Sequence, residues 1–184
     1  VARQVSRWSK QYRASETDNI EAMNNLIEWL PKNIPDDDET TIVHGDYRLD
    51  NMILKNNEVI GILDWELSTL GHPIADFSYH CLSWRTQEAF WDEAKLKELG
   101  IPSEKEYMEM YCENSGKDLS KNWEFYMAFN MFKIAGILQG ILGRVRDGTA
   151  ASKHAEERGN MVFPLSEAAW STICLLYTSD AADD

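Results

Sequence analysis

The most informative part of the sequence is His44-Gly45-Asp46-Tyr47-Arg48-Leu49-Asp50-Asn51, with Asp64 thirteen residues after Asn51. Short segments rich in β-branched and aliphatic residues flank this stretch. They are residues 41–43, 52–54 and 59–63, and an Asn56-Asn57 turn separates the second from the third. We therefore expect the polar residues of the stretch to lie on loops between short strands.

The spacing of the polar residues matches the kinase catalytic loop, His-x-Asp-x-x-x-x-Asn, with a metal-binding Asp further along the chain. Phosphoryl transfer needs a carboxylate that accepts the hydroxyl proton and oxygen ligands that hold Mg²⁺ against the phosphates. Asp46, Asn51 and Asp64 supply this set. The alternative is a β-hairpin whose Asp and Asn side chains only satisfy backbone groups of turns.

The same residues also resemble a known family. His44-Gly45-Asp46 through Asn51, Asp64-Trp65-Glu66 and Gly71-His72-Pro73-Ile74-Ala75-Asp76 are similar to the aminoglycoside phosphotransferase and choline kinase-like superfamily. Within it, the sequence resembles the kinase domain of acyl-CoA dehydrogenase family members ten and eleven and their free-standing bacterial relatives, over residues 1–173. The resemblance implies an α+β, mainly helical fold. It would be the C-terminal lobe of a protein-kinase-like domain, with a short β-hairpin region that carries the catalytic loop.

The resemblance assigns a role to each matching residue. Asp46 matches the catalytic base, and His44 matches the residue that braces the loop. Asn51 and Asp64 match the magnesium ligands, through which the ATP cofactor is held. Asp76 matches an Asp that hydrogen-bonds the loop backbone, and an N-cap of the following helix is compatible with that role.

Two further residues near the loop have open alternatives. Arg48 lies where protein kinases often place a Lys near the transferred phosphate, so its guanidinium could stabilise transition-state charge. An ion pair with Asp50 or Glu66 is the alternative. Glu66 could contact the metal through water, or only be solvated.

The predicted function is ATP- and Mg²⁺-dependent phosphoryl transfer to a hydroxyl of a small molecule. The resemblance implies a 4-hydroxy acid carried as its CoA thioester, and fusion to or association with an acyl-CoA dehydrogenase. One alternative acceptor is an aminoglycoside, choline or another amino alcohol, and another alternative is a non-catalytic nucleotide-binding module. Arg144, Arg146 and Lys153 are candidate contacts to an anionic substrate.

A complete kinase also has a Gly-rich phosphate loop and a strand Lys paired with a helix Glu. The sequence contains no G-x-G-x-x-G stretch. We expect these parts in an N-terminal lobe before Val1, and little catalysis by the chain alone.

Composition narrows the class of protein. The 184 residues include 18 Lys and Arg against 31 Asp and Glu, a net charge of −13 that disfavours nucleic-acid binding. Three cysteines without zinc spacing indicate a reducing compartment. Together with the family resemblance, this leads us to expect an intracellular location, cytoplasmic in a bacterium and mitochondrial or peroxisomal in a eukaryote. Polar residues interrupt the apolar stretch 125–143, which favours a buried helix over a membrane span.

The remaining pattern is helical, apart from the last residues. Helices are predicted from residue 1 to about 12, 20–30 with Asp18 as cap, 75–84, 87–99, 104–116 behind a Ser103-Glu106 capping box, 122–146, and 154–173 with a kink or restart at Pro164. Trp65, Trp84 and Trp91 are expected in the core. Residues 174–184 resemble the translation of a transposase mosaic-end sequencing adapter, and an ordinary acidic C-terminus is the alternative.

Overall fold

The computed structural model describes residues 1–36, 39–86, 93–119, 122–150 and 154–180, with side chains to residue 174. These residues form two compact units. The helical unit comprises Val1–Asp36 and Glu124–Asp184, and the strand unit comprises Asp37–Trp123. The described residues are mostly helical with two small two-stranded sheets, so the predicted α+β, mainly helical class is confirmed.

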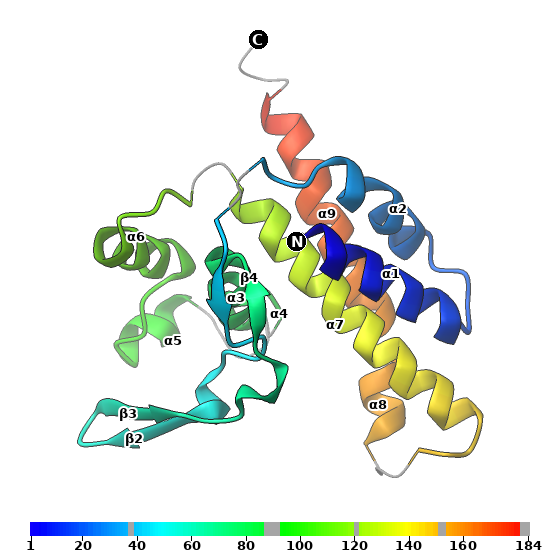
Figure 1. The fold of residues 1–184 in the computed structure, drawn as a ribbon, viewed down its shortest axis with the longest axis horizontal. Helices are drawn as coiled ribbons and strands as arrows, with labels where there is room; N and C mark the ends of the chain where they lie inside the picture. The colour runs from blue at the N-terminus through cyan, green and yellow to red at the C-terminus, as the bar shows by residue number, and fades with distance from the viewer. Residues whose placement is uncertain (37–38, 87–92, 120–121, 151–153, 181–184) are drawn as a thin grey trace. The chain divides into compact units, whose positions relative to one another are not determined.

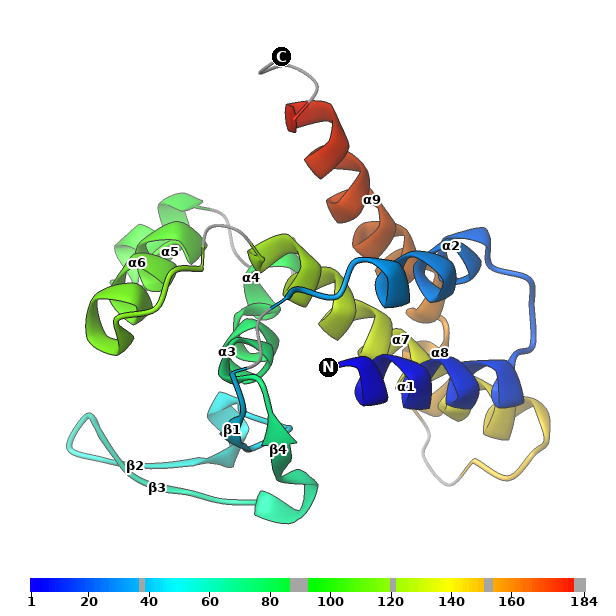
Figure 2. The same ribbon diagram turned by 45° about the horizontal axis from the view of Figure 1, so that its top comes forward.

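The helices of the helical unit (Figure 1) bury apolar side chains in a common core. Its elements are α1 (Ala2–Ser15), α2 (Glu21–Trp29), the 3-10 turn η1 (Leu30–Lys32), all but the first residue of α7 (Trp123–Arg146), α8 (Ala155–Gly159) and α9 (Val162–Asp180). The largest fully buried side chains include Tyr12, Met23, Leu26, Tyr126, Phe132 and Ile173. Helix α2 lies beside α9 in both ribbon views (Figures 1 and 2).

Helix α7 supplies much of this core, as the apolar stretch 125–143 predicts. By length and composition it could cross a membrane, but 61% of its most apolar window is buried inside the protein, which is typical of a core helix. Gln139 on α7 is fully buried, and its amide donates to Ser15 O at 2.7 Å and to Thr17 Oγ1 at 2.8 Å. The buried amide N–H groups therefore tie α7 to the end of α1.

One predicted helix cap in the helical unit is wrong, and the predicted break at Pro164 is confirmed. Asp18 does not cap α2: the N-cap is Ile20, without a side-chain hydrogen bond, and Asp18 instead pairs with Arg146. Pro164 marks a restart, because α8 ends at Gly159 and Pro164 lies in the first turn of α9, where no backbone N–H is needed. Helix α9 continues past residue 173 to Asp180, and residues 181–184 of the suspected adapter tail lie outside the described residues.

The strand unit carries the loop 44–51 between two antiparallel strand pairs (Figure 2). Its elements are β1 (Thr41–Val43), η2 (Leu49–Asn51), β2 (Met52–Lys55), β3 (Glu58–Ile62), η3 (Trp65–Leu67), β4 (Thr69–Gly71), α3 (Pro73–Cys81), α4 (Ser83–Thr86), α5 (Glu93–Glu98) and α6 (Glu104–Ser115). Strand β1 pairs with β4, with Thr41 opposite Gly71 and Val43 opposite Thr69. Strands β2 and β3 form a separate hairpin that extends away from this pair.

The predicted turn between β2 and β3 is confirmed. Asn56 and Asn57 have φ angles of 52° and 63°, the left-handed values that a two-residue hairpin turn requires and that Asn tolerates. The sequence did not predict β4, which has only three residues. Its Gly71 lies so close to β1 that a Cβ there would be 2.9 Å from Val43 Cγ2.

The helices of the strand unit follow local sequence signals. The predicted helix 75–84 is divided into α3 and α4, and residues 87–92 of the next predicted helix, with Trp91, lie outside the described residues. The predicted capping box opens α6: Ser103 Oγ accepts from Glu106 N–H, and Glu106 accepts from Ser103 N–H at 2.8 Å. Gly116 ends α6 in the left-handed conformation.

The capping box gives a stability prediction. Ser103→Ala removes the acceptor for the Glu106 N–H, so we expect the free energy of unfolding to fall by about 1 kcal/mol in urea denaturation. Ser103→Asn keeps a capping oxygen without placing a second charge beside the Glu106 carboxylate, and it should change the free energy of unfolding by no more than about 0.5 kcal/mol. Equal losses in both variants would show that the hydroxyl acts otherwise than as a cap.

Candidate active site

The loop 44–51 begins where β1 ends, and a glycine permits its first turn. Gly45 has a φ of 84°, and a Cβ at this position would lie 2.5 Å from Leu67 O in η3. A side chain here would therefore require both a left-handed backbone and a displaced neighbour. The glycine lets the loop turn tightly against η3 immediately before Asp46.

Asp76 holds the start of the loop from α3. One carboxylate oxygen accepts the backbone N–H of His44, and the other accepts that of Gly45 at 2.8 Å. This is the contact to the loop backbone that the family resemblance implies. The N-cap alternative is wrong, because His72 caps α3 through a hydrogen bond from Ile74 N–H, and Asp76 lies within the first turn.

His44 links the loop to the end of β3. Its Nδ1 accepts from Asp46 N–H at 3.2 Å, so the ring proton is on Nε2, which donates to Leu63 O at 2.7 Å. Leu63 N–H in turn donates to Asn51 O at 2.8 Å. The buried imidazole thus fixes the backbone immediately before Asp64 against the start of the loop, and the bond from Leu63 to Asn51 fixes it against the end of the loop.

The carboxylate of Asp46 receives donors from two elements. Asn51 Nδ2 donates to its Oδ2 at 3.0 Å and to its backbone carbonyl at 2.9 Å. The phenol of Tyr79, on α3, donates to its Oδ1 at 2.8 Å. The two bonds from Asn51 use Nδ2 and do not occupy the lone pairs of its amide oxygen.

Arg48 forms two loose ion pairs within the loop. Its Nε lies 3.6 Å from Asp46 Oδ2, and a terminal nitrogen lies 3.5 Å from Asp50 Oδ2. The Arg48 side chain is 52% exposed. Exposed pairs of this kind stabilise a protein little, so the guanidinium can leave them for another anion.

Asp64 has an unusual backbone conformation. Its φ is 65° and ψ is 50°, which places a non-glycine residue in the left-handed region between β3 and η3. In the described part of the chain, no hydrogen bond or ion pair engages its exposed carboxylate or that of Glu66. Strained backbone of this kind is frequent at functional sites.

The side-chain oxygens of Asn51 and Asp64 fit Mg²⁺ better than a metal that needs three or more protein ligands. The described residues contain no cluster of three or more His, Cys, Asp or Glu side chains that could hold a metal. Magnesium commonly takes one or two protein oxygen ligands and completes its shell with water and substrate phosphates. The amide oxygen of Asn51 and the exposed carboxylate of Asp64 meet that requirement.

Sequence reasoning missed Tyr79. It lies one turn after Asp76 on α3, so both face the loop, and this i, i+3 spacing is the signal that could have identified it. Burial, reinforced by the bond to Asp46, raises the pKa of Tyr79 well above its usual value. The phenol therefore remains protonated and keeps donating at neutral pH.

The tryptophans expected in the core lie in different environments, and His80 on α3 packs against the loop. Trp65 is not in the core: it is 47% exposed, and its ring lies 4.8 Å from that of His44. Trp84 is half-buried against Tyr107. His80 packs on Tyr47, and burial lowers the pKa of His80.

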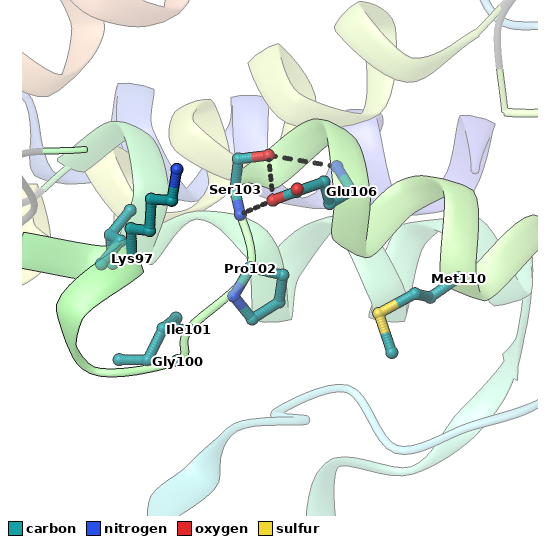
Figure 3. Close-up of a pocket in the computed structure, with 8 residues that line it drawn as sticks. Lys97, Gly100, Ile101, Pro102, Ser103, Glu106 and Met110 are labelled. Atoms are coloured by element: carbon teal, nitrogen blue, oxygen red, sulfur yellow. Dashed lines mark hydrogen bonds between the residues drawn. The ribbon is translucent and has the colours of Figure 1, made fainter. Parts of the chain in front are cut away.

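A separate hollow of about 580 Å³ lies at the turn between α5 and α6 (Figure 3). Its lining comes from these two helices and the turn, including Lys97, Ile101, Pro102 and Met110. The loop 44–51 does not contribute to it. The hollow is therefore no part of the candidate active site.

Comparison with known proteins places this arrangement in a family. The profile of the phosphotransferase enzyme family matches residues 1–111. The chain is 46% identical over 177 residues to acyl-CoA dehydrogenase family member 10 of Mus musculus, covering 92% of this chain and 17% of that protein. It is 42% identical over 172 residues to family member 11 of Homo sapiens, covering 90% of this chain and 22% of that protein.

A solved structure gives the same result. The chain is 48% identical to a protein from Ralstonia eutropha JMP134 described as a candidate aminoglycoside phosphotransferase, with a TM-score of 0.85. The match covers 92% of this chain and 54% of that one. This chain thus spans about a fifth of the curated relatives and about half of the solved one. It belongs to the phosphotransferase enzyme family.

Proposed function

We propose that the chain carries the catalytic loop of a kinase that transfers the γ-phosphoryl group of ATP to a hydroxyl of a small molecule. The observation that carries this proposal is the Asp46 carboxylate, which is held at both oxygens beside Asn51 and is linked through His44 and Leu63 to the backbone of Asp64. These are the base and the two metal ligands that phosphoryl transfer uses.

Each residue has a definite part in the proposed reaction. Asp46 accepts the hydroxyl proton as the acceptor oxygen bonds to the γ-phosphorus and the bond to the β–γ bridging oxygen breaks, which releases ADP. Asn51 and Asp64 would hold Mg²⁺, which neutralises phosphate charge when bound. Arg48 leaves its weak pairs with Asp46 and Asp50 to contact the transferred phosphoryl group.

The Gly-rich loop and the Lys–Glu pair that cover the nucleotide in a complete kinase are proposed to come from an N-terminal lobe. The match to only 54% of the solved relative supports this, as does the lack of a Gly-rich loop motif in the sequence. The proposal assigns residues 1–173 to the C-terminal lobe and leaves out the adapter-like residues 174–184. We call the chain extended by this lobe the complete kinase, and we expect the isolated chain to have little activity.

The role of Asp46 can be tested by one substitution. Asp46→Asn in the complete kinase keeps the size of the side chain but removes the base, so kcat should fall by about 10²- to 10⁴-fold. The affinity for ATP should change by no more than about twofold, because the phosphate contacts remain. Glu109→Gln, at an exposed carboxylate on α6, is the matched control and should leave kcat unchanged. Undiminished turnover by Asp46→Asn would exclude Asp46 as the base.

Metal dependence separates a kinase from a non-catalytic module. Calorimetric titration of the complete kinase with ATP should show at least about tenfold tighter binding with Mg²⁺ than with EDTA. Asp64→Asn weakens a magnesium ligand and should remove most of this difference. ATP binding that is indifferent to Mg²⁺ in the wild type would contradict the proposed metal site.

For the acceptor, we propose a 4-hydroxyacyl-CoA. The support is the 42% and 46% identity to proteins named as acyl-CoA dehydrogenase family members, and fusion to or association with such a dehydrogenase is part of the same proposal. An intracellular location also belongs to it, since ATP is the donor and all three cysteines are free. Of the basic residues considered for the CoA phosphates, Arg146 is engaged by Asp18 and Thr17 O, Arg144 is exposed, and Lys153 lies outside the described residues.

A screen of acceptors tests this assignment. The complete kinase is incubated with ATP and Mg²⁺ and with 4-hydroxyacyl-CoAs, the free 4-hydroxy acids, choline or aminoglycosides, and ADP release is measured. We expect the highest kcat/KM with the CoA thioesters and at least about tenfold less with the free acids, which lack the remote binding groups. Turnover confined to choline or aminoglycosides would replace the proposed acceptor by a cationic one.

A further inference from the structure

Two donors from different elements hold the proposed base. Tyr79 Oη, from α3, donates to Asp46 Oδ1 at 2.8 Å, and Asn51 Nδ2, from η2, donates to Oδ2 at 3.0 Å. Rotation of the carboxylate about its Cβ–Cγ bond would stretch both hydrogen bonds. The orientation of the carboxylate plane is therefore determined jointly by α3 and by the loop itself.

Helix α3 contacts the loop through two residues on one face of the helix. Asp76 accepts the N–H groups of His44 and Gly45, and Tyr79, three residues later, reaches the side chain of Asp46. Residues three apart on a helix lie on the same face. The helix thus fixes both the backbone before Asp46 and the carboxylate of Asp46, with no flexible segment between the two contacts.

The phenol of Tyr79 is suited to a permanent donor role. Its burial raises the pKa of the phenol, so it stays protonated over the pH range in which kinases work. Tyr79 belongs to the last turn of α3 and not to a loop tip. Groups supported by regular secondary structure hold catalytic geometry more closely than groups on loops do.

We propose that Tyr79 is a positioning residue for phosphoryl transfer. Its hydrogen bond keeps Asp46 in one orientation, in which the lone pairs not used by Tyr79 and Asn51 face the acceptor hydroxyl. A carboxylate offers about four lone-pair sites, so two bound donors still leave room for the hydroxyl proton. This inference rests on the proposed function of Asp46 as the base.

A different role would make an opposite prediction. If the phenol only occupied the position of the acceptor hydroxyl, its removal would free the site and leave kcat unchanged or higher. If Tyr79 positions Asp46, its removal lets the carboxylate rotate away from the productive orientation and lowers kcat. The sign of the change in kcat therefore distinguishes the two roles.

The test is Tyr79→Phe in the complete kinase. We expect kcat to fall by about tenfold, because small losses of alignment at a reacting group cost rates of this order, while KM for ATP stays within about twofold. Tyr111→Phe is the matched control. The Tyr111 ring, on α6, stacks on that of Phe77 of α3 with the ring centroids 3.9 Å apart, and loss of the Tyr111 hydroxyl should leave both constants unchanged. An unchanged or higher kcat in Tyr79→Phe would overturn the proposal.

A double substitution shows whether Tyr79 acts through Asp46. In the Asp46→Asn background, Tyr79→Phe should reduce the residual kcat by less than about twofold, because the group that it positions is already absent. A structural role elsewhere would lower kcat by the same factor in both backgrounds. Equal factors would therefore contradict the assignment.

The contact can also be tested in the 184-residue chain without an activity assay. Unfolding free energies of Tyr79→Phe, Asp46→Ala and the double variant should be non-additive, since the single changes remove the same hydrogen bond. Additive values would refute the coupling of the two side chains. Absence of turnover by the wild-type complete kinase would instead contradict the proposed function. The unfolding cycle would still test the Tyr79–Asp46 hydrogen bond, because it needs no activity.

Discussion

The two hydrogen bonds from His44 and Gly45 N–H to the carboxylate of Asp76 are the contact on which the rest of the site depends. Where β1 ends, the chain turns through the left-handed Gly45, and its backbone N–H groups no longer have a strand partner to bond. An ionised carboxylate is the strongest acceptor available for such groups. Its position in the first turn of α3 is also favoured by the helix dipole. The loop is consequently anchored to α3, a helix that begins only after the last strand, β4, has ended.

His44 extends this attachment to the other side of the loop. Its imidazole bonds both Asp46 N–H and Leu63 O, and this holds the end of β3 against the loop. Many apolar side chains of the β2–β3 hairpin, such as Leu54 and Ile60, are exposed. Burial of apolar surface contributes little there. Polar contacts between backbone and side chains therefore set the relation between Asp46 and Asp64, and the left-handed backbone of Asp64 is tolerated within that framework.

The sequence predicts those features whose signals are local. The Ser103-Glu106 capping box lies within four residues, and the loop 44–51 has a fixed internal spacing, so both are recognisable from the order of residues alone. Asp18 looked like a helix cap by the same local rule, but its partner Arg146 is 128 residues away and competes for the carboxylate. Tyr79 is 33 residues from Asp46, so their contact has no local pattern, and its trace in the sequence is the i, i+3 spacing of Tyr79 from Asp76 on one helix. Strand β4 was missed because three residues that end in glycine carry too weak a pattern.

The arrangement around Asp46 suits the chemistry proposed for it. A loose phosphoryl-transfer transition state involves little covalent participation by the protein, so catalysis depends on placement of the reacting groups and on charge stabilisation. The described contacts serve placement: the carboxylate is fixed by two donors, its backbone N–H by His44, and the preceding peptide groups by Asp76. In the proposed reaction, charge stabilisation would come from the exposed Arg48 guanidinium, whose ion pairs are loose, and from the Mg²⁺ that the exposed Asp64 carboxylate would help to hold. In the proposed kinase, the base must stay aligned with the acceptor, whereas the groups that bind the phosphates must let the nucleotide enter and leave. The rigidly held Asp46 and the loosely paired Arg48 meet these two requirements.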